Sequence, residues 1–285
     1  MASTTEPRQA DPDGGGLEGI ERVRKWIRET GYPLEYATAR TLTKLGYQAL
    51  QGVHYQGTSD ADRRPREIDV VGLVELPMIE GSPLPDEEVV VQLVVECKVL
   101  RLPWVVLTRE GRLPWLDLLR MAIASVSAIR HLTAAAEASG EVPDLFASPT
   151  RMGFSAVEAR IPTAGERKEE ARSREERVDG AYAALQQVAS ASRALISGTH
   201  GYRLCWPIVV VRGPLFHLGY TESGDELLEP VEWTRVMWSG HAATTTAIDI
   251  VRERHLEAYA RMALKGLEMS RQRLTTVSNA RRAAR

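Results

Sequence analysis

The chain has 285 residues, of which 44% are hydrophobic and 26% are charged, and its formal net charge is −2. This composition is typical of a globular protein with a substantial core, and it excludes a protein that coats nucleic acid through bulk positive charge. Two cysteines, Cys97 and Cys205, are too few for a disulfide framework or a zinc knuckle, which fits a reducing compartment. No stretch approaches the roughly 20 apolar residues of a membrane span, and the first residues contain no signal-peptide-like apolar run. We therefore expect a cytoplasmic protein without membrane contact.

The segments of the chain predict one domain between two tails. Residues 1–16 are small, polar and rich in glycine, so we expect them to be disordered. Residues 17–270 alternate between helical and strand patterns without a clean linker, which favours a single α/β domain. Within it, residues 140–178 are predicted to form an irregular insertion. Residues 271–285 form a basic tail that we expect to fray.

The first part of the domain predicts two helices followed by three strands. Apolar residues at helical spacing predict helices over residues 17–31 and 33–46, each ending near a glycine. Val-rich and alternating runs predict strands over residues 47–57, 67–76 and 89–100. Because the connections between these strands are short, we expect them to form a meander.

The second part is predicted to continue this alternation. Ala-rich runs predict helices over residues 115–138 and 181–199. A buried strand over residues 204–213 is followed directly by residues 214–222, which we expect to pair with it as a hairpin. Residues 231–240 are predicted to form an edge strand. Residues 247–274 are predicted to begin as a short strand and to continue as a C-terminal helix.

The strand over residues 89–100 ends on two charged side chains. Side chains alternate between the two sides of a strand, so Glu96 and Lys98 project from the same side. Gln92 and Val94 share that side. The opposite side is predicted to carry four apolar residues: Val91, Leu93, Val95 and Cys97.

These charges point to metal chemistry. A carboxylate at the end of an apolar strand costs several kcal/mol of desolvation unless something compensates it. A divalent cation shared between Glu96 and Asp69, on the preceding strand, compensates better than Lys98 alone, and Mg²⁺ prefers such oxygen ligands. The metal would polarise a phosphoryl oxygen and lower the pKa of a bound water, while Lys98 would orient that water or neutralise the transition state. The residues therefore predict metal-assisted hydrolysis of a phosphodiester.

The order of these residues resembles the PD-(D/E)XK nuclease superfamily, which has the restriction-endonuclease-like fold. Asp69 matches the aspartate of its motif, Glu96 and Lys98 match its (D/E)-x-K, and a helix bearing a glutamate, in "GYPLE", comes first. The segments "ECKVLRLPWVV", "AYAALQQV" and "WPIVVVRGPLF" resemble a bacterial group within the superfamily. The resemblance covers roughly residues 31–250 apart from the predicted insertion, and Ile68 stands where the motif has proline.

This resemblance implies a restriction-endonuclease-like core, with a mixed central sheet flanked by helices, and a Mg²⁺- or Mn²⁺-dependent deoxyribonuclease. Asp69, Glu96 and the backbone carbonyl of Cys97 would hold the metal. Lys98 would position or activate the water. The match implies two further site residues: Glu35, beside a second metal or its waters, and Gln187, beside Lys98 or the scissile phosphate.

Basic residues near the motif are candidates for contacts to a nucleic-acid backbone, because phosphates accept most protein–nucleic-acid hydrogen bonds. An ordinary exposed surface is the competing interpretation. Trp104, which follows an "RLP" tripeptide, is expected to pack in the core rather than stack on bases. The basic candidates are Arg64, Arg66, Arg101, Arg109 and Arg112.

Each motif residue also has a simpler structural interpretation. Glu96 and Lys98 could form only a salt bridge at a strand end, and Asp69 could be an edge aspartate. Glu35 could complement the dipole of its helix, and Gln187 could face solvent.

The predicted function has three alternatives, which are action on RNA, a non-catalytic nucleic-acid-binding module, and a subunit of a defence complex that a partner protein activates. A homodimer is also compatible with the chain. The charged residues 164–177 are a plausible docking segment for a partner. A role in bacterial genome defence or DNA processing follows only by analogy with other stand-alone nucleases.

Overall fold

The structure is a computed structural model. Both predicted tails lie outside the residues that it describes, as do most of the predicted helix over residues 115–138 and the docking segment over residues 164–177. The described residues are 17–57, 65–76, 89–111, 123–124, 128, 151–159, 179–197, 202–239, 245–266 and 268.

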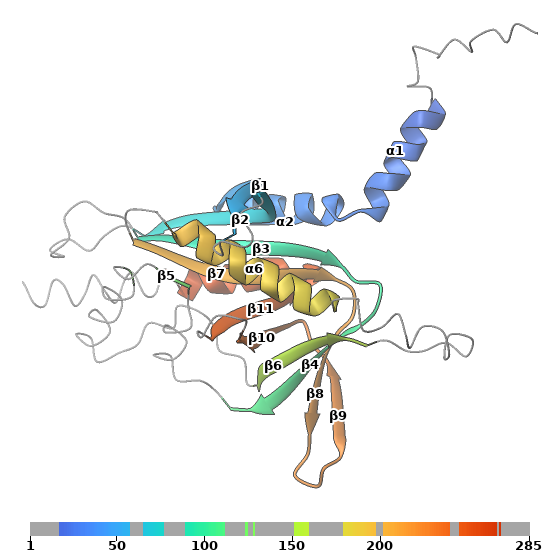
Figure 1. Ribbon diagram of the computed structural model, residues 1–285, viewed down its shortest axis with the longest axis vertical. Coiled ribbons are helices and arrows are strands. Elements are labelled where there is room, and N and C mark those ends of the chain that lie inside the picture. The colour runs from blue at the N-terminus through green and yellow to red at the C-terminus, as the bar shows by residue number, and fades with distance from the viewer. Residues whose placement is uncertain are drawn as a thin grey trace, which may run out of the picture.

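One mixed sheet organises the described part of the chain (Figure 1). Its strand order is β1-β2-β3-β7-β11-β10-β6-β4-β8-β9, and β5 pairs with β7 beside this path. Four pairs are parallel (β3–β7, β7–β11, β6–β10 and β4–β8) and the others are antiparallel, which confirms the predicted α/β class with a mixed sheet. The strands are β1 (Gln48–Gln56), β2 (Pro65–Leu76), β3 (Val89–Val99), β4 (Trp104–Glu110), β5 (Ile123–Ala124), β6 (Arg151–Glu158), β7 (Tyr202–Arg212), β8 (Leu215–Tyr220), β9 (Glu226–Pro230), β10 (Trp233–Trp238) and β11 (Thr246–Arg252).

Helices cover both faces of the sheet, and α1 projects away from it (Figure 1). One face packs against α2 and the C-terminal helical residues 256–266, and the other packs against α6. Among the described helices, none is both long and apolar enough to cross a membrane. The labelled helical elements are α1 (Leu17–Glu29), α2 (Tyr32–Lys44), α6 (Gly180–Ile196) and the 3-10 helix η1 (Glu253–His255).

The predicted meander is confirmed, because β1, β2 and β3 pair in sequence and antiparallel. The predicted faces of β3 are also confirmed. Val94 packs in the cluster beneath α6, whereas the other named residues of β3 pack in the cluster beneath α2. Those residues are Val91, Leu93, Val95 and Cys97.

Two predictions for the middle of the chain are wrong at some of the residues that the structure describes, although Ala128 is helical as predicted. Ile123 and Ala124 were assigned to a helix, but they form β5 against Cys205 and Leu204 of β7. Because β11 pairs with β7 only further along, β5 supplies hydrogen-bond partners to a length of buried strand that would otherwise lack them. The predicted irregular insertion contains β6, whose residues include one β-branched side chain, Val157, and gave no strand signal.

The predicted hairpin between β7 and β8 is also wrong, because β8 pairs with β4 and β9 instead. The parallel strands β3 and β7 end side by side, with Val99 opposite Arg212, and the chain turns after each of them. There the N–H of Leu100 donates to the carbonyl of Arg212 at 2.9 Å. Gly213 has a φ of +152°, and a Cβ on it would lie 2.6 Å from the Cβ of Leu100. The two chains therefore bend together, and the pair β3–β7 continues as the pair β4–β8.

The predicted edge strand, β10, lies inside the sheet between β11 and β6. Its Arg235 is fully buried opposite Asp249 of β11, and Nε and Nη2 donate to the two carboxylate oxygens at 2.7 and 2.8 Å. Trp206 and Tyr259 also donate to Asp249, at 2.9 and 2.5 Å. This network neutralises the charge of Arg235 and allows its strand a central position in the sheet.

We predict that Asp249→Asn lowers the free energy of unfolding by about 3–5 kcal/mol, because it leaves the buried Arg235 guanidinium without its counter-charge. Urea unfolding followed by circular dichroism measures the change. As a control, Glu257→Gln removes an exposed ion pair with Arg261 and should change stability by less than about 1 kcal/mol. Equal stability of both variants would contradict a structural role for the buried network.

Candidate active site where β2 and β3 separate

Strands β2 and β3 separate at one end of the sheet. Their pairing runs from Leu76 opposite Val89 to Val70 opposite Val95 and ends there. Beyond that point β2 continues against β1 and β3 continues against β7. The separation leaves the next pair of residues along the two strands, which includes Asp69, outside the regular ladder.

Asp69 bridges the two strands where they part. Its Oδ2 accepts a hydrogen bond from the backbone N–H of Cys97 at 2.6 Å. On the other side of β2, Gly52 of β1 has a φ of +62°, a left-handed conformation that favours glycine. Gly52 and Asp69 are not paired, although the residues on either side of them are. Both ladders of β2 are therefore interrupted at Asp69, which is the point where its side chain crosses to β3.

Glu96 and Lys98 lie on the same side of β3, as predicted from strand periodicity, and form an ion pair. The Glu96 side chain is 1% exposed, whereas the Lys98 side chain is 35% exposed. Lys98 Nζ donates a hydrogen bond to Oε1 of the Glu96 carboxylate, while Oε2 is buried and accepts no hydrogen bond. A buried carboxylate oxygen without a partner is costly in a structural salt bridge and is typical of an oxygen available to a ligand.

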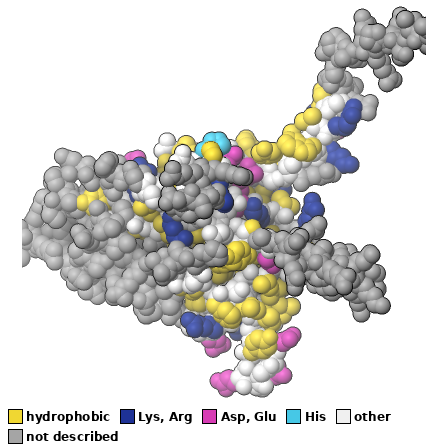
Figure 2. All heavy atoms as spheres, viewed as in Figure 1, with side chains coloured by type: hydrophobic (Ala, Val, Ile, Leu, Met, Phe, Trp, Pro, Cys, Tyr) yellow, Lys and Arg dark blue, Asp and Glu magenta, His cyan; other side chains and the backbone are white. Residues whose placement is uncertain are grey.

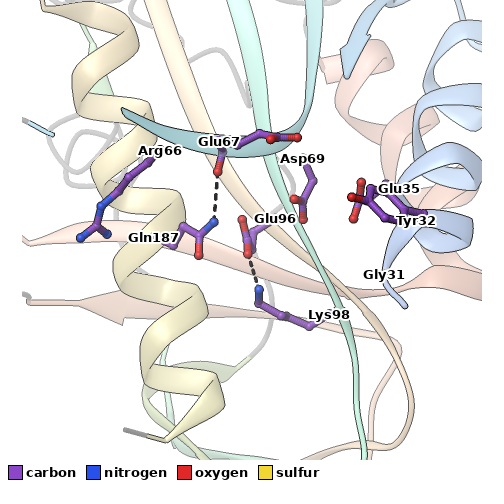
Figure 3. A pocket seen from close by; sticks show the side chains of 9 residues that line it. All are labelled: Gly31, Tyr32, Glu35, Arg66, Glu67, Asp69, Glu96, Lys98 and Gln187. Atoms are coloured by element: carbon purple, nitrogen blue, oxygen red, sulfur yellow. Dashed lines mark hydrogen bonds and ion pairs between the residues drawn. The ribbon is translucent and has the colours of Figure 1, made fainter. Parts of the chain in front are cut away.

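The three motif side chains line one open cavity of about 530 Å³ (Figure 3). Asp69 and Glu96 point toward each other from neighbouring strands, and Lys98 lies below Glu96. The structure thus brings together all five residues that the sequence identified as catalytic candidates. The cavity is lined by Gly31, Tyr32, Glu35, Arg66, Glu67, Asp69, Glu96, Lys98 and Gln187.

Glu35 reaches the cavity from α2, which packs on the face of the sheet that carries Cys97. One turn further along α2, the buried Thr38 lies with its Oγ1 3.6 Å from the Cys97 Sγ, so α2 is fixed against the end of β3. Residues three apart share a helix face, which directs Glu35 to the mouth of the site. A Cβ on Gly31 would lie 3.0 Å from Glu35 Oε1, so a glycine here leaves room for the carboxylate.

Gln187 reaches the cavity from α6, on the opposite face. Its Nε2 donates to the backbone carbonyl of Glu67 at 3.2 Å, which ties α6 to the first residues of β2 (Figure 3). Its neighbour Gln186 turns instead toward Ser190 on α6. This hydrogen bond goes to β2 rather than to Lys98, so Gln187 supports the strand that carries Asp69, and its role beside Lys98 or the scissile phosphate stays a prediction.

Burial and mutual repulsion raise the pKa values of the three acids. Burial and then the Asp69 carboxylate raise the pKa of Glu96, Lys98 opposes the rise, and together they bring it to about 7. Burial also raises the pKa of Asp69, against the opposing effects of the Cys97 N–H and Lys98. The pKa of Glu35 is raised by burial and then by Asp69 and Glu67. Acids thus outnumber bases in this site, because Glu35, Glu67, Asp69 and Glu96 face only Arg66 and Lys98.

The residues fit the divalent cation that the sequence predicted. Among the described residues, no group of three or more His, Cys, Asp or Glu side chains is arranged to hold a metal by itself. Magnesium, however, is commonly held by one or two carboxylates together with waters and substrate oxygens. Asp69 and the free Oε2 of Glu96 supply those carboxylates, and a cation would relieve their repulsion. The Cys97 carbonyl, on the residue between Glu96 and Lys98, stays a prediction as the third ligand.

Among the predicted backbone-contacting arginines that the structure describes, Arg66 alone lines the cavity. Arg101 and Arg109 are exposed but do not line it, and Arg64 and Arg112 lie outside the described residues. Trp104 is 1% exposed, which confirms that it packs in the core.

Sequence reasoning missed Glu67 and Tyr32, which also line the cavity. Glu67 stands two residues before Asp69, so strand periodicity could have identified it. Tyr32 stands three residues before Glu35, so helix periodicity could have identified it.

Comparisons with protein-family models, curated proteins and solved structures return no match for this chain. The class of the site is therefore argued from its residues and their geometry.

We predict that Glu96→Gln stabilises the metal-free protein at high pH. Because folding raises the pKa of Glu96 from 4.5 to about 7, the proton binds more tightly in the folded state. Stability from this group is complete below pH 4.5 and is lost as the pH rises toward 7. In EDTA at pH 8, Glu96→Gln should therefore raise the free energy of unfolding by on the order of 1–3 kcal/mol, and the gain should vanish near pH 4.

Urea unfolding at both pH values tests this, with Glu75→Gln at an exposed position of β2 as the control. A Glu96→Gln variant less stable than the wild type at pH 8 would mean that the carboxylate serves the fold.

Proposed function

We propose that the protein is a Mg²⁺- or Mn²⁺-dependent nuclease of the PD-(D/E)XK kind that hydrolyses phosphodiester bonds in DNA. One observation carries the proposal: two carboxylates on separating strands and an amine share one open cavity, and one buried carboxylate oxygen has no partner. The fold supports it, because the motif residues lie on α2, β2, β3 and α6, in the chain order of the segments that carry the resemblance. By analogy with stand-alone nucleases, we place the activity in bacterial genome defence or DNA processing.

The proposed mechanism assigns a role to each residue. Asp69 and Glu96 hold the cation, and Asp69 is kept in place by the Cys97 N–H. A divalent cation, when bound, lowers the pKa of a coordinated water and polarises the phosphoryl group. Lys98, partly exposed at the cavity, then orients the attacking water and offsets negative charge in the transition state. Glu35 accepts hydrogen bonds from water at the α2 side of the cavity.

The structural alternative, a salt bridge at a strand end, explains less. An isolated pair of Glu96 and Lys98 would account for Oε1 but not for the unsatisfied Oε2. It would also not account for Asp69 and Glu35, which add negative charge beside an already buried carboxylate. Because buried like charges destabilise a fold, their gathering in a cavity is typical of a functional site.

We predict that Asp69→Asn and Lys98→Ala each lower the cleavage rate by about 100-fold or more, since each removes a positioned catalytic group. The assay uses the purified full chain with labelled DNA and RNA, in Mg²⁺, in Mn²⁺ and in EDTA. Asp225→Asn and Lys265→Ala, exposed and remote from the cavity, are the matched controls.

Cleavage by the wild type that persists in both motif variants would refute the proposal. A wild type that is inactive on every substrate but binds Mn²⁺ in calorimetry would favour the partner-activated alternative. Faster cleavage of RNA than of matched DNA would reassign the substrate.

We predict that Gln187→Ala lowers the cleavage rate by roughly 10-fold without abolishing Mn²⁺ binding, because outer supports of a metal site contribute on that scale. Its hydrogen bond to the Glu67 carbonyl holds the start of β2, two residues before Asp69. Gln186→Ala is the matched control, since that side chain turns toward Ser190. Equal rates in the two variants would show that α6 does not position β2 for catalysis.

A further inference from the structure

Three aromatic side chains gather at the junction of α1 and α2, beside the cavity. The rings of Trp26 and Tyr32 lie with their centroids 5.6 Å apart, and both residues are more than half exposed. Tyr36 is 62% exposed. Figure 2 shows hydrophobic and basic side chains side by side along the projecting helix α1. Three exposed aromatic rings so close together are unusual for a surface that contacts only water.

This aromatic face is continuous with the candidate active site. Tyr32 lines the cavity and lies beside Glu35 on α2 (Figure 3). Tyr36 follows Tyr32 by four residues and Arg40 follows by four more, so the three share one exposed stripe of α2. The rise of about 1.5 Å per helical residue places successive members about 6 Å apart along the helix. Along this stripe, the ring of Tyr32 lies at the cavity, the ring of Tyr36 follows, and the Arg40 side chain lies furthest from the cavity.

The charge at the cavity limits how a nucleic acid can bind there. Four of the lining residues are acids (Glu35, Glu67, Asp69 and Glu96), and two are bases (Arg66 and Lys98). One divalent cation would only balance these charges. Affinity from phosphate contacts depends on many Lys and Arg side chains, so this site needs a second source of binding energy. Stacking of bases on exposed aromatic rings supplies such energy without reading the sequence.

We infer that Trp26, Tyr32 and Tyr36 bind unpaired nucleobases, so that the substrate of the proposed nuclease is single-stranded or locally unpaired. The faces of bases inside a duplex are covered by their neighbours and cannot reach these rings. A single strand can lay its bases along the aromatic stripe, while Arg40 meets its backbone and a phosphate enters the cavity. This inference names the substrate class of the proposed nuclease and rests on that proposal.

A second copy of the chain is the competing occupant of this region. The stripe of α1 formed by Ile20, Val23 and Ile27 is exposed, and another α1 could cover it. That interpretation does not use Tyr36, which lies on α2, or the entry of Tyr32 into the cavity.

Fluorescence anisotropy with labelled oligonucleotides in EDTA tests the inference without cleavage. The full-length protein is titrated against single-stranded DNA, single-stranded RNA and a duplex of the same sequence. We predict that Trp26→Ala and Tyr36→Ala each weaken single-strand binding by roughly 10-fold, and that Trp26→Phe and Tyr36→Phe retain most of it. Tyr220→Ala, at an exposed ring on β8, is the matched control and should bind like the wild type.

Unchanged single-strand affinity in both alanine variants, or tighter binding of the duplex, would overturn the inference. So would a wild-type dimer in sedimentation velocity that Trp26→Ala dissociates while single-strand affinity is unchanged. These failures differ from failure of the proposed function. A wild type that cleaves DNA while Tyr36→Ala binds single strands normally would refute only the substrate class. Ring-dependent binding by a wild type that neither cleaves nor binds Mn²⁺ would refute the nuclease instead.

Discussion

The hydrogen bond from the Cys97 N–H to the Asp69 carboxylate takes the place of a backbone hydrogen bond between β2 and β3, whose pairing ends at this point. Wherever two neighbouring strands separate, the backbone groups between them need other partners. Here one carboxylate oxygen meets that need, and the same side chain is held at the mouth of the cavity. Because β3 continues against β7 beyond this point, Glu96 and Lys98 keep strand geometry while β2 turns away.

The rest of the fold holds the separated strands from both faces. Thr38 of α2 contacts Cys97 on one face, and Gln187 of α6 binds the start of β2 on the other. The buried pair of Arg235 and Asp249 joins β10 to β11, and β11 in turn pairs with β7 beside the site. A rigid support of this kind permits a cluster of acids that would otherwise repel one another apart.

The buried Glu96 carboxylate works against the stability of the metal-free protein. Glu96 is almost completely buried, its pKa is raised to about 7, and one of its oxygens has no partner. A fold selected for stability alone would replace it with an amide or an apolar side chain. The arrangement becomes more favourable when positive charge enters the cavity.

The sequence by itself determined the local features of this protein. Strand periodicity placed Glu96 and Lys98 on one side of β3, and helix periodicity defined α2 and α6, because both patterns depend only on neighbours along the chain. Only the tertiary structure decided the pairing of distant strands. The turn at Gly213 directs the chain away from β7, so that β8 pairs with β4. The ion pair with Asp249 permits Arg235 to lie buried in the centre of the sheet. Strand β6 forms from residues without a strand signal. The aromatic face beside the cavity likewise arises only where α1 meets α2, since contacts between segments are absent from any local pattern.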